Sequence, residues 1–145
     1  MRVRRFADDD WGEWLRMSQA LFPDEPREGL ELGMGDFRTR ADAAVFIAER
    51  DDGSACGFVE AGARPYADGC ETSPVGYVEA WYVDPDVRRQ GIGRALLAAA
   101  EDWARGMGYH EMASDALLDN VVSHQAHLRS GYSEVDRVVQ FRKTL

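Results

Sequence analysis

The sequence has few of the features that mark metal sites, secreted proteins or membrane proteins. Its 145 residues include only two cysteines, Cys56 and Cys70, which form no CxxC motif and have no histidine pair nearby. This pattern does not indicate a zinc site, and reduced thiols are expected. The basic start of the chain leads into an acidic segment instead of an apolar one, and no later run reaches the length of a membrane span. We therefore expect a cytoplasmic protein with no bound metal and no membrane partner.

Positive charge is scarce as well. Lysine and arginine number 17 against 26 aspartate and glutamate residues, which gives a formal net charge of -9. Such a chain repels a nucleic-acid backbone unless its basic residues gather on one face, and it favours a cationic partner. An acidity that only keeps the protein in solution is an equal alternative on charge alone. The length and the 45% hydrophobic content predict a single globular domain over residues 1–145.

Hydrophobic periodicity predicts strands and helices in alternation along the chain. The expected strands are 3–6, 44–48, 56–61, 75–83, 109–114, 132–135 and 138–141, and the expected helices are 11–21, 91–105 and 120–129. Residues 51–53 are typical of a hairpin turn, and the long apolar run 75–83 predicts a buried central strand. Segment 22–40 is acidic and broken by proline and glycine, so we expect a loop or a short, loose helix there.

A glycine-rich hexapeptide, residues 88–93 (RRQGIG), lies between the predicted central strand and the helix that follows it. Glycines let the backbone approach a ligand, and the free N–H groups of a first helical turn attract an anion. The segment therefore predicts a pyrophosphate site. Its spacing matches neither the three-glycine dinucleotide motif nor the Walker loop. A plain turn at a helix start produces the same hexapeptide, so its surroundings decide.

The hexapeptide resembles the R/Q-x-x-G-x-G/A signature of the GNAT superfamily of acetyltransferases. Asn120, His127 and Gly131-Tyr132 stand at the positions of the second motif of that superfamily, N-x6-Y-x3-G-F. The resemblance implies a mixed α/β GNAT fold, with a central, mostly antiparallel sheet of six to seven strands, a splayed parallel pair at the acetyl-CoA site and helices on both faces. It also implies that acetyl-CoA is bound by Tyr82, Val83, Arg88, Arg89, Gln90, Gly91, Ile92, Gly93, Arg94 and Asn120.

Within this resemblance, His127 stands where the superfamily usually has a tyrosine that is thought to protonate the departing CoA thiolate. The resemblance thus gives His127 the role of general acid, which an imidazolium can fill near neutral pH. A histidine that only packs or is solvated near the cofactor is an equal alternative.

The chemistry of the acceptor amine points to carboxylates. An alkylamine has a pKa of about 10, so one group must hold the ammonium and a group must remove its proton. Glu79 interrupts the apolar run 75–83, where a carboxylate costs free energy unless it faces a wet cleft. We expect Glu79 to be the general base, directly or through a water, although a solvent-facing strand position would explain it too. Asp115 follows the next predicted strand and should face the same cleft.

A longer resemblance covers most of the chain. Segments 66–74, 111–115 and 137–143 resemble the aminoglycoside 6'-N-acetyltransferases, which implies direct transfer in a ternary complex and a homodimer. It also implies that an aminoglycoside contacts Phe22, Glu25, Tyr66, Glu79, Asp115 and Asp136. Two of these, Phe22 and Tyr66, could equally be core or dimer-contact aromatics, and the acidic segment 24–31 could equally be a solvated loop.

Two other functions stay open at this point. The acceptor could be another amine, such as a polyamine, an amino acid or a protein N-terminus, because function resides in the site and not in the fold. Alternatively, the domain could bind acetyl-CoA as a sensor without transferring the acetyl group, a possibility suggested by His127. The sequence decides neither the regiochemistry nor which of Glu79 and Asp115 takes the proton.

Overall fold

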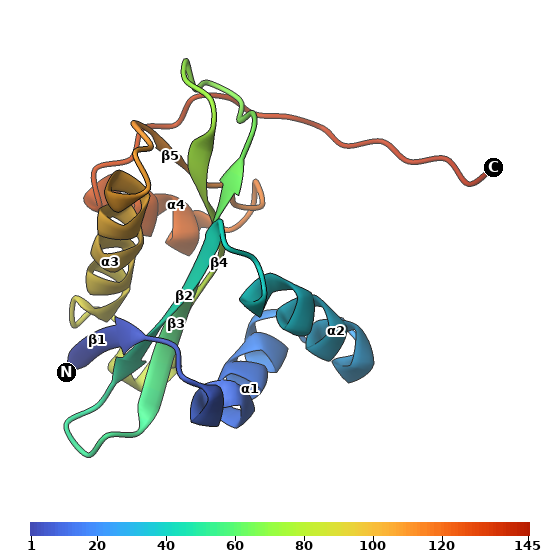
Figure 1. Cartoon of the computed structure of the whole chain (residues 1–145). Coiled ribbons are helices and arrows are strands. Elements are labelled where there is room, and N and C mark those ends of the chain that lie inside the picture. Colours follow the sequence, from blue (N-terminus) through green and yellow to red (C-terminus); the bar gives the residue numbers. More distant parts are fainter.

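A five-stranded sheet forms the centre of the computed structural model, which describes residues 1–145 (Figure 1). The strands follow chain order across the sheet: β1 (Arg2–Arg5), β2 (Ala43–Glu49), β3 (Ala55–Arg64), β4 (Val75–Val83) and β5 (Met112–Ala113). The first four pair antiparallel, and β5 pairs parallel to β4. The predicted mixed, mostly antiparallel sheet is therefore confirmed.

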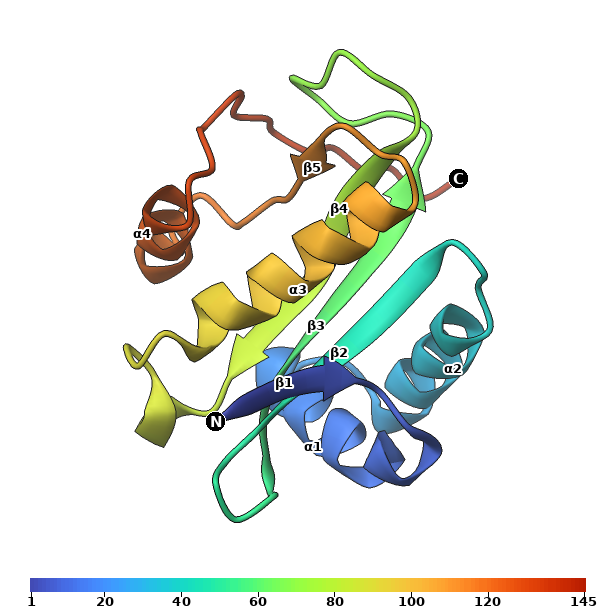
Figure 2. The same cartoon turned by 60° about the vertical axis from the view of Figure 1, so that its left-hand side comes forward.

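Helices cover both faces of this sheet, as expected. The helices α1 (Trp11–Leu21) and α2 (Arg27–Arg38) lie on one face, and α3 (Ile92–Gly106) lies on the other (Figures 1 and 2). The fourth helix, α4 (Val121–Arg129), follows β5, and short 3-10 helices occupy Asp8–Asp10 and Pro85–Val87. No helix is both long and apolar enough to cross a membrane.

Each covered face has its own apolar cluster. Beneath α1 and α2, the fully buried side chains include Trp14, Met17 and Phe58. Beneath α3, Leu96 and Leu97 pack on the opposite face. Because β3 and β4 are buried on both faces, they appear in the sequence as almost continuous apolar runs. A carboxylate in either strand is therefore exceptional.

The segment 22–40 contains a regular helix, α2, where the sequence indicated a loop or a short, loose helix. Met34 is buried, and Leu30 and Phe37 pack against the same cluster. These apolar residues are spaced three and four apart, so they form one face of the helix. A Cβ atom at Gly33 would meet nothing within 4 Å, so this glycine faces open space. Tertiary packing of the apolar face thus outweighs the glycine penalty of about 1 kcal/mol.

The strands predicted at 132–135 and 138–141 are absent, so the sheet has five strands and not six to seven. Residues 133–145 form no helix or strand and run away from the sheet in an extended segment (Figure 1). Its apolar side chains, among them Val138, Val139 and Phe141, are exposed. The alternation of these residues favours strand pairing, but the segment pairs with no strand of this chain, and β5 keeps an open edge.

The two parallel strands separate soon after they meet. Strands β4 and β5 pair only at Gly76 with Met112 and at Tyr77 with Ala113. The rest of β4, from Val78 to Val83, has no strand on that side, as the predicted splay requires. On its other side β4 carries a bulge at Glu79, because Glu60 pairs with Ala80 and Ala61 pairs with Val78.

Candidate active site

The loop that precedes α3 has the geometry of an anion site. Gly91 is the N-cap of α3 and has a positive φ of 85°, a conformation that glycine adopts readily. Arg89 and Arg94 are exposed and form no ion pair, and the first N–H groups of α3 have no partner within the helix. The donors and charges at this helix start fit a diphosphate.

The predicted cofactor residues are not equivalent in the structure. Ile92 is buried in the core beneath α3, so only its backbone can face a ligand. Gly93 leaves room for Trp81, whose ring atoms would lie 3.1 Å from a Cβ at that position and whose indole N–H donates to the Gly93 carbonyl at 3.1 Å. Arg88 is turned back, because its Nε donates to the carbonyl of Val83 at 2.9 Å. Arg88 therefore fastens the loop to the end of β4.

The segment around Tyr82 and Val83 belongs to the part of β4 that has no neighbour on its β5 side. Tyr82 is buried, and Val83 is half-buried. Backbone groups on that open side are free to bind a ligand, such as a thioester carbonyl. Asn120 has a structural role as the N-cap of α4. Its Oδ1 accepts a hydrogen bond from the backbone N–H of Ser123 at 3.1 Å.

Glu79 and Asp115 are linked through two other side chains into one cluster. Arg64 donates to both oxygens of Glu79 at 2.7 Å, and its guanidinium lies 3.5 Å from the centre of the Tyr77 ring. The hydroxyl of Tyr77 donates to Asp115. Four side chains from β3, β4 and the segment after β5 are thus linked in a row. We call this row, Arg64, Glu79, Tyr77 and Asp115, the carboxylate cluster.

Sequence reasoning missed Arg64 and Tyr77. Tyr77 lies two residues before Glu79, on the same predicted face of the strand, and this alternation was the available signal. Arg64 could not be found in this way, because its approach to Glu79 depends on the β3–β4 register. Burial, and then the hydrogen bond to Asp115, raise the pKa of Tyr77 above its usual value, so the phenol remains a donor.

His127 is held on both ring nitrogens. Its Nδ1 lies 2.7 Å from the carbonyl of Ser123, and its Nε2 lies 2.7 Å from the hydroxyl of Ser114. A carbonyl only accepts, so a hydrogen is assigned to Nδ1, and Nε2 shares a hydrogen bond with the Ser114 hydroxyl, which can donate or accept. The ring also packs edge-on against Trp81 at 5.2 Å. These contacts join α4 to the open side of β4.

The other predicted substrate residues have no hydrogen bond or ion pair to the carboxylate cluster. Phe22 caps the end of α1 and is 39% exposed, and Glu25 is fully on the surface. Tyr66 is exposed in the β3–β4 loop and donates to Asp68 at 2.8 Å. The hydrogen bond to Asp68 raises the pKa of the Tyr66 phenol, and the charge of Asp136 in the extended C-terminal segment adds to this effect.

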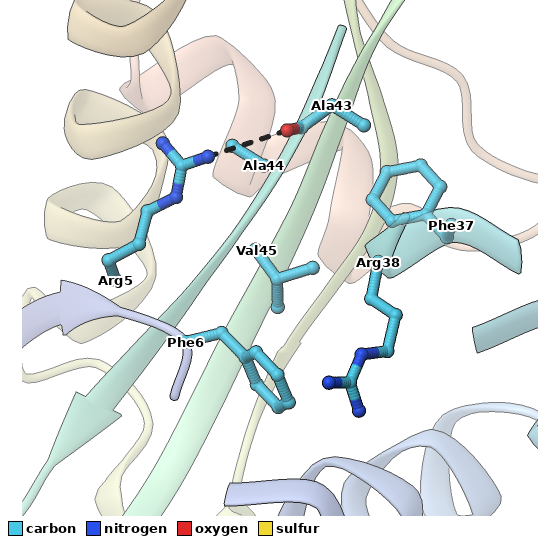
Figure 3. Close-up of a pocket in the computed structure, with 7 residues that line it drawn as sticks. All are labelled: Arg5, Phe6, Phe37, Arg38, Ala43, Ala44 and Val45. Atoms are coloured by element: carbon cyan, nitrogen blue, oxygen red, sulfur yellow. Dashed lines mark hydrogen bonds between the residues drawn. The ribbon is translucent and has the colours of Figure 1, made fainter. Parts of the chain in front are cut away.

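Two of the cavities in the structure flank the sheet. The larger, of about 670 Å³, lies beside β5 between α3, α4 and the start of the C-terminal segment, and its lining includes Tyr77, Asp115 and His127. The smaller, of about 180 Å³, lies at the β1–β2 edge near α2 and is framed by Arg5, Phe6 and Arg38 (Figure 3). Of these two cavities, the larger contains predicted site residues and the smaller contains none.

Comparison with known proteins gives a family. The acetyltransferase (GNAT) family model matches residues 7–132. The aminoglycoside N(6')-acetyltransferase type 1 of Klebsiella aerogenes is 44% identical over 99% of this chain and 96% of its own length. The enzyme of the same name from Stenotrophomonas maltophilia is 41% identical over 99% of this chain and 93% of its own.

Solved structures agree with this result. The aminoglycoside antibiotic 6'-N-acetyltransferase AAC(6')-IG from Acinetobacter haemolyticus superposes with a TM-score of 0.93 at 34% identity, covering 100% of this chain and 99% of that one. AAC(6')-Iy, in complex with the bisubstrate analogue CoA-S-monomethyl-acetylneamine, gives a TM-score of 0.93 at 32% identity, covering 99% and 98%. The chain therefore belongs to the acetyltransferase (GNAT) family, in its group of aminoglycoside 6'-N-acetyltransferases, and is an acetyl-CoA-dependent N-acetyltransferase.

Proposed function

We propose that the protein transfers the acetyl group of acetyl-CoA to the 6'-amine of an aminoglycoside. The observation that carries the proposal is the carboxylate cluster, which lies where β4 separates from β5. A polycationic sugar needs anionic partners, and two carboxylates beside an open strand supply them. The relatives named after this activity, at 44% and 41% identity, support the same acceptor.

Acetyl-CoA would lie along the open side of β4. The first amides of α3, with Arg89, Gln90 and Arg94, would hold its pyrophosphate, and the backbone near Tyr82 and Val83 would polarise its thioester carbonyl. Bound there, acetyl-CoA supplies the activated acetyl group. Both substrates then react in one ternary complex, so positioning contributes most of the rate.

The carboxylates would act on the amine. In this scheme the acceptor ammonium binds beside Glu79 in competition with Arg64, while Asp115, held by Tyr77, contacts a second amine. Glu79 takes the proton of the reacting ammonium, directly or through a water, and the freed nitrogen attacks the carbonyl carbon. The carbon–sulfur bond breaks, and the thiolate leaves. The attacking nitrogen loses its second proton as the amide forms, and the thiolate takes up a proton, which His127 beside Ser114 would supply in the predicted role of general acid.

The test is CoA release with acetyl-CoA and a panel of amines. The panel holds aminoglycosides with and without a 6'-amine, spermidine and a short peptide. We expect turnover only with sugars that carry the 6'-amine, and a fall of about a hundredfold or more in kcat/KM for Glu79→Gln, the usual contribution of a general base. Asp102→Asn, on the exposed side of α3, is the matched control and should behave as wild type.

The outcomes separate the alternatives. Turnover confined to spermidine or to the peptide would replace the acceptor while leaving the acetyltransferase chemistry in place. Acetyl-CoA binding without turnover on any amine would favour a sensor module. Full activity in Glu79→Gln would remove that residue from the role of base.

We also propose that the protein is a homodimer through its C-terminal segment and that it works in the cytoplasm, where acetyl-CoA is made. The exposed apolar residues of 135–141 and the short, open strand β5 beside the larger cavity support the dimer. An apolar extended segment and an unpaired edge satisfy one another when two copies meet. Because Asp136 lies in that segment, dimer formation would also fix its position.

A further inference from the structure

A buried aspartate, Asp84, lies directly after β4, where the loop that leads into α3 begins, and it has no part in the scheme above. Its side chain is 10% exposed, and Asp10 is the only other buried aspartate of the chain. A carboxylate so far from water costs free energy unless cations and hydrogen bonds compensate for the loss of hydration. The partners of Asp84 therefore bear directly on why a charge is kept there.

Two arginines from other parts of the chain hold this carboxylate. Arg16 in α1 donates to its two oxygens at 3.1 Å and 3.2 Å, and Arg50 in the β2–β3 turn donates to Oδ2 at 3.2 Å. Arg50 also donates to both oxygens of Asp86, at 2.8 Å and 3.0 Å. The backbone N–H of Asp84 donates to the carbonyl of Cys56 in β3 at 2.8 Å. Asp84 thus joins α1, β3 and the β2–β3 turn at one end of the sheet (Figure 2).

The loop that begins at Asp84 has a conformation that needs support. Arg89 has a φ of 62° and is the one residue other than glycine with a positive φ in the chain. Such a conformation is strained, and it persists where the surrounding structure enforces it. Asp84 holds the start of the loop through its ion pairs, and the buried Ile92 holds its end. These two attachments together fix the path of the backbone through Arg89.

The carboxylate does not favour the ligand through its charge. A negative group repels a pyrophosphate, so Asp84 is compatible with this loop only because Arg16 and Arg50 neutralise it. Those two arginines are bound to aspartates, whereas Arg89 and Arg94 form no ion pair and stay available to the ligand. The contribution of Asp84 is therefore to the geometry of the loop.

We propose that Asp84 is a positioning residue for acetyl-CoA. Together with Arg16 and Arg50, it holds the loop between β4 and α3 in the conformation in which the first amides of α3 meet the pyrophosphate. This inference rests on the proposed function, because that function places the pyrophosphate at this loop. Asp84 touches neither substrate. It orders the loop before the cofactor arrives, so that binding does not carry the entropic cost of ordering it. Loss of Asp84 should therefore weaken acetyl-CoA binding and leave the chemical step unchanged.

Calorimetric titration with CoA and steady-state kinetics with kanamycin test this role in Asp84→Asn, which keeps the shape of the side chain and removes its charge. We expect the Kd of CoA and the KM for acetyl-CoA to rise about tenfold, the effect of one lost hydrogen bond to a charged group. The kcat at saturating acetyl-CoA and the KM for kanamycin should stay nearly unchanged, because Asp84 has no bond to the carboxylate cluster. The CoA titration needs no acceptor, so it decides the matter even if kanamycin is not turned over.

Two further variants separate positioning from stability. Asp10→Asn is the matched control, because Asp10 is similarly buried, accepts from Arg4 at 2.7 Å and 2.8 Å and has no bond to the loop. It should lower the thermal midpoint as Asp84→Asn does and leave the Kd of CoA as in wild type. Arg50→Met changes a residue of an exposed turn and should raise that Kd by about threefold, the effect of a partly exposed ion pair. Added to Asp84→Asn, it should change little more, since the two residues act as a pair.

Other results would overturn the inference. An equal rise in the Kd of CoA for Asp84→Asn and Asp10→Asn would show a general loss of stability. An unchanged or lower Kd in Asp84→Asn would show that the loop keeps its conformation without the carboxylate. In either case, a raised Kd in Arg94→Gln would keep the proposed position of the cofactor. If Arg94→Gln and Asp84→Asn both bind CoA as wild type does, the pyrophosphate lies elsewhere, and the inference fails together with that position.

Discussion

Arg64 gives the Glu79 carboxylate a partner before any substrate arrives. The bidentate pair occupies both oxygens, yet the Arg64 side chain is 42% exposed and the Glu79 side chain 24% exposed, so the pair stands at the surface of the cleft. Ion pairs in such settings contribute little to stability. A cationic acceptor can therefore replace the guanidinium without great loss. The guanidinium also stacks on the Tyr77 ring, a contact that does not depend on the pair with Glu79.

The variant Arg64→Met tests this competition at the residue scale. Methionine keeps the apolar stem on the Tyr77 ring and removes the charge. We expect the acceptor KM to fall by about three- to tenfold, the range of a partly exposed ion pair, with an unchanged KM for acetyl-CoA. A higher acceptor KM would mean that Arg64 holds Glu79 in place for the amine and does not compete with it.

Glu60 predicts a pH effect on stability that is independent of any substrate. Its pKa is about 7 in the folded protein, against 4.5 for an exposed glutamate, so the folded state holds the proton more tightly. The stabilising contribution is fully present below pH 4.5 and is lost as the pH rises through 7.

Urea unfolding of wild type and Glu60→Gln at pH 4.5, 6 and 8.5 measures this contribution. The advantage of Glu60→Gln over wild type should grow by roughly 2 to 3 kcal/mol between the lowest and the highest pH, as the shift in pKa requires. A difference that is constant with pH would show that Glu60 titrates at its ordinary value.

At the scale of elements, the sequence predicts most of the helices and strands that form by burying a regular apolar face. The strands β1 to β4 and the helices α1, α3 and α4 all have an apolar face with the expected period, and each is present within a few residues of the predicted range. The glycine loop before α3 is also where the motif placed it. Local spacing was enough in these cases because each element meets the sheet through its own regular face.

The elements that the sequence missed depend on contacts between distant residues. The helix α2 forms because Leu30, Met34 and Phe37 find the sheet, although three glycines weaken it. The two predicted C-terminal strands do not form within this chain, because alternation of apolar residues does not decide pairing and segment 133–145 pairs with no other strand. In the site, the Glu79–Arg64 pair follows from the register of β3 and β4, including the bulge, and no local pattern encodes that register.

A pair of glycine variants separates the influence of local helix propensity from that of contacts between distant residues. In α2, Gly33→Ala adds a Cβ that meets nothing within 4 Å, so helix propensity alone should stabilise the protein by about 0.5 to 1 kcal/mol. In β3, Gly57→Ala places a Cβ 2.8 Å from the Tyr82 carbonyl oxygen and 3.1 Å from Leu96, so overpacking should destabilise it by about 1 to 3 kcal/mol.

Thermal unfolding and the KM for acetyl-CoA are the measurements. Only Gly57→Ala should also raise that KM, since it pushes on the end of β4 next to the cofactor loop. Destabilisation of both variants alike would mean that the α2 glycines are needed for packing and are not merely tolerated.

On the scale of the whole molecule, the distribution of charge matches two substrates of opposite sign. Most arginines are engaged in ion pairs, and the positive side chains without such a pair include Arg88, Arg89 and Arg94 at the cofactor loop. These three arginines concentrate positive charge at the start of α3 in a chain whose net charge is -9. A protein of this kind can attract a polycation over most of its surface and still bind a pyrophosphate at the start of α3.

The C-terminal segment leads to a prediction about assembly. Phe141 is 91% exposed, Val138 and Val139 are also exposed, and the strand β5 has an open edge beside the larger cavity. Sedimentation should therefore find the 16.2 kDa chain as a dimer, held by this apolar segment. Phe141→Asp should weaken that dimer, because it places a charge in an apolar contact, whereas the neighbouring Arg142→Gln serves as a control that keeps the apolar surface.

Activity should follow assembly in the same variants. If the segment that contains Asp136 is fixed only in the dimer, Phe141→Asp should raise the acceptor KM at low protein concentration and recover as the concentration increases. Acetyl-CoA binding should not change, because contacts within a single copy of the chain hold the loop before α3 in place. A wild-type protein that sediments as a monomer at all concentrations and is fully active would contradict both the dimer and the part given to Asp136, and would leave the exposed apolar segment to some other contact.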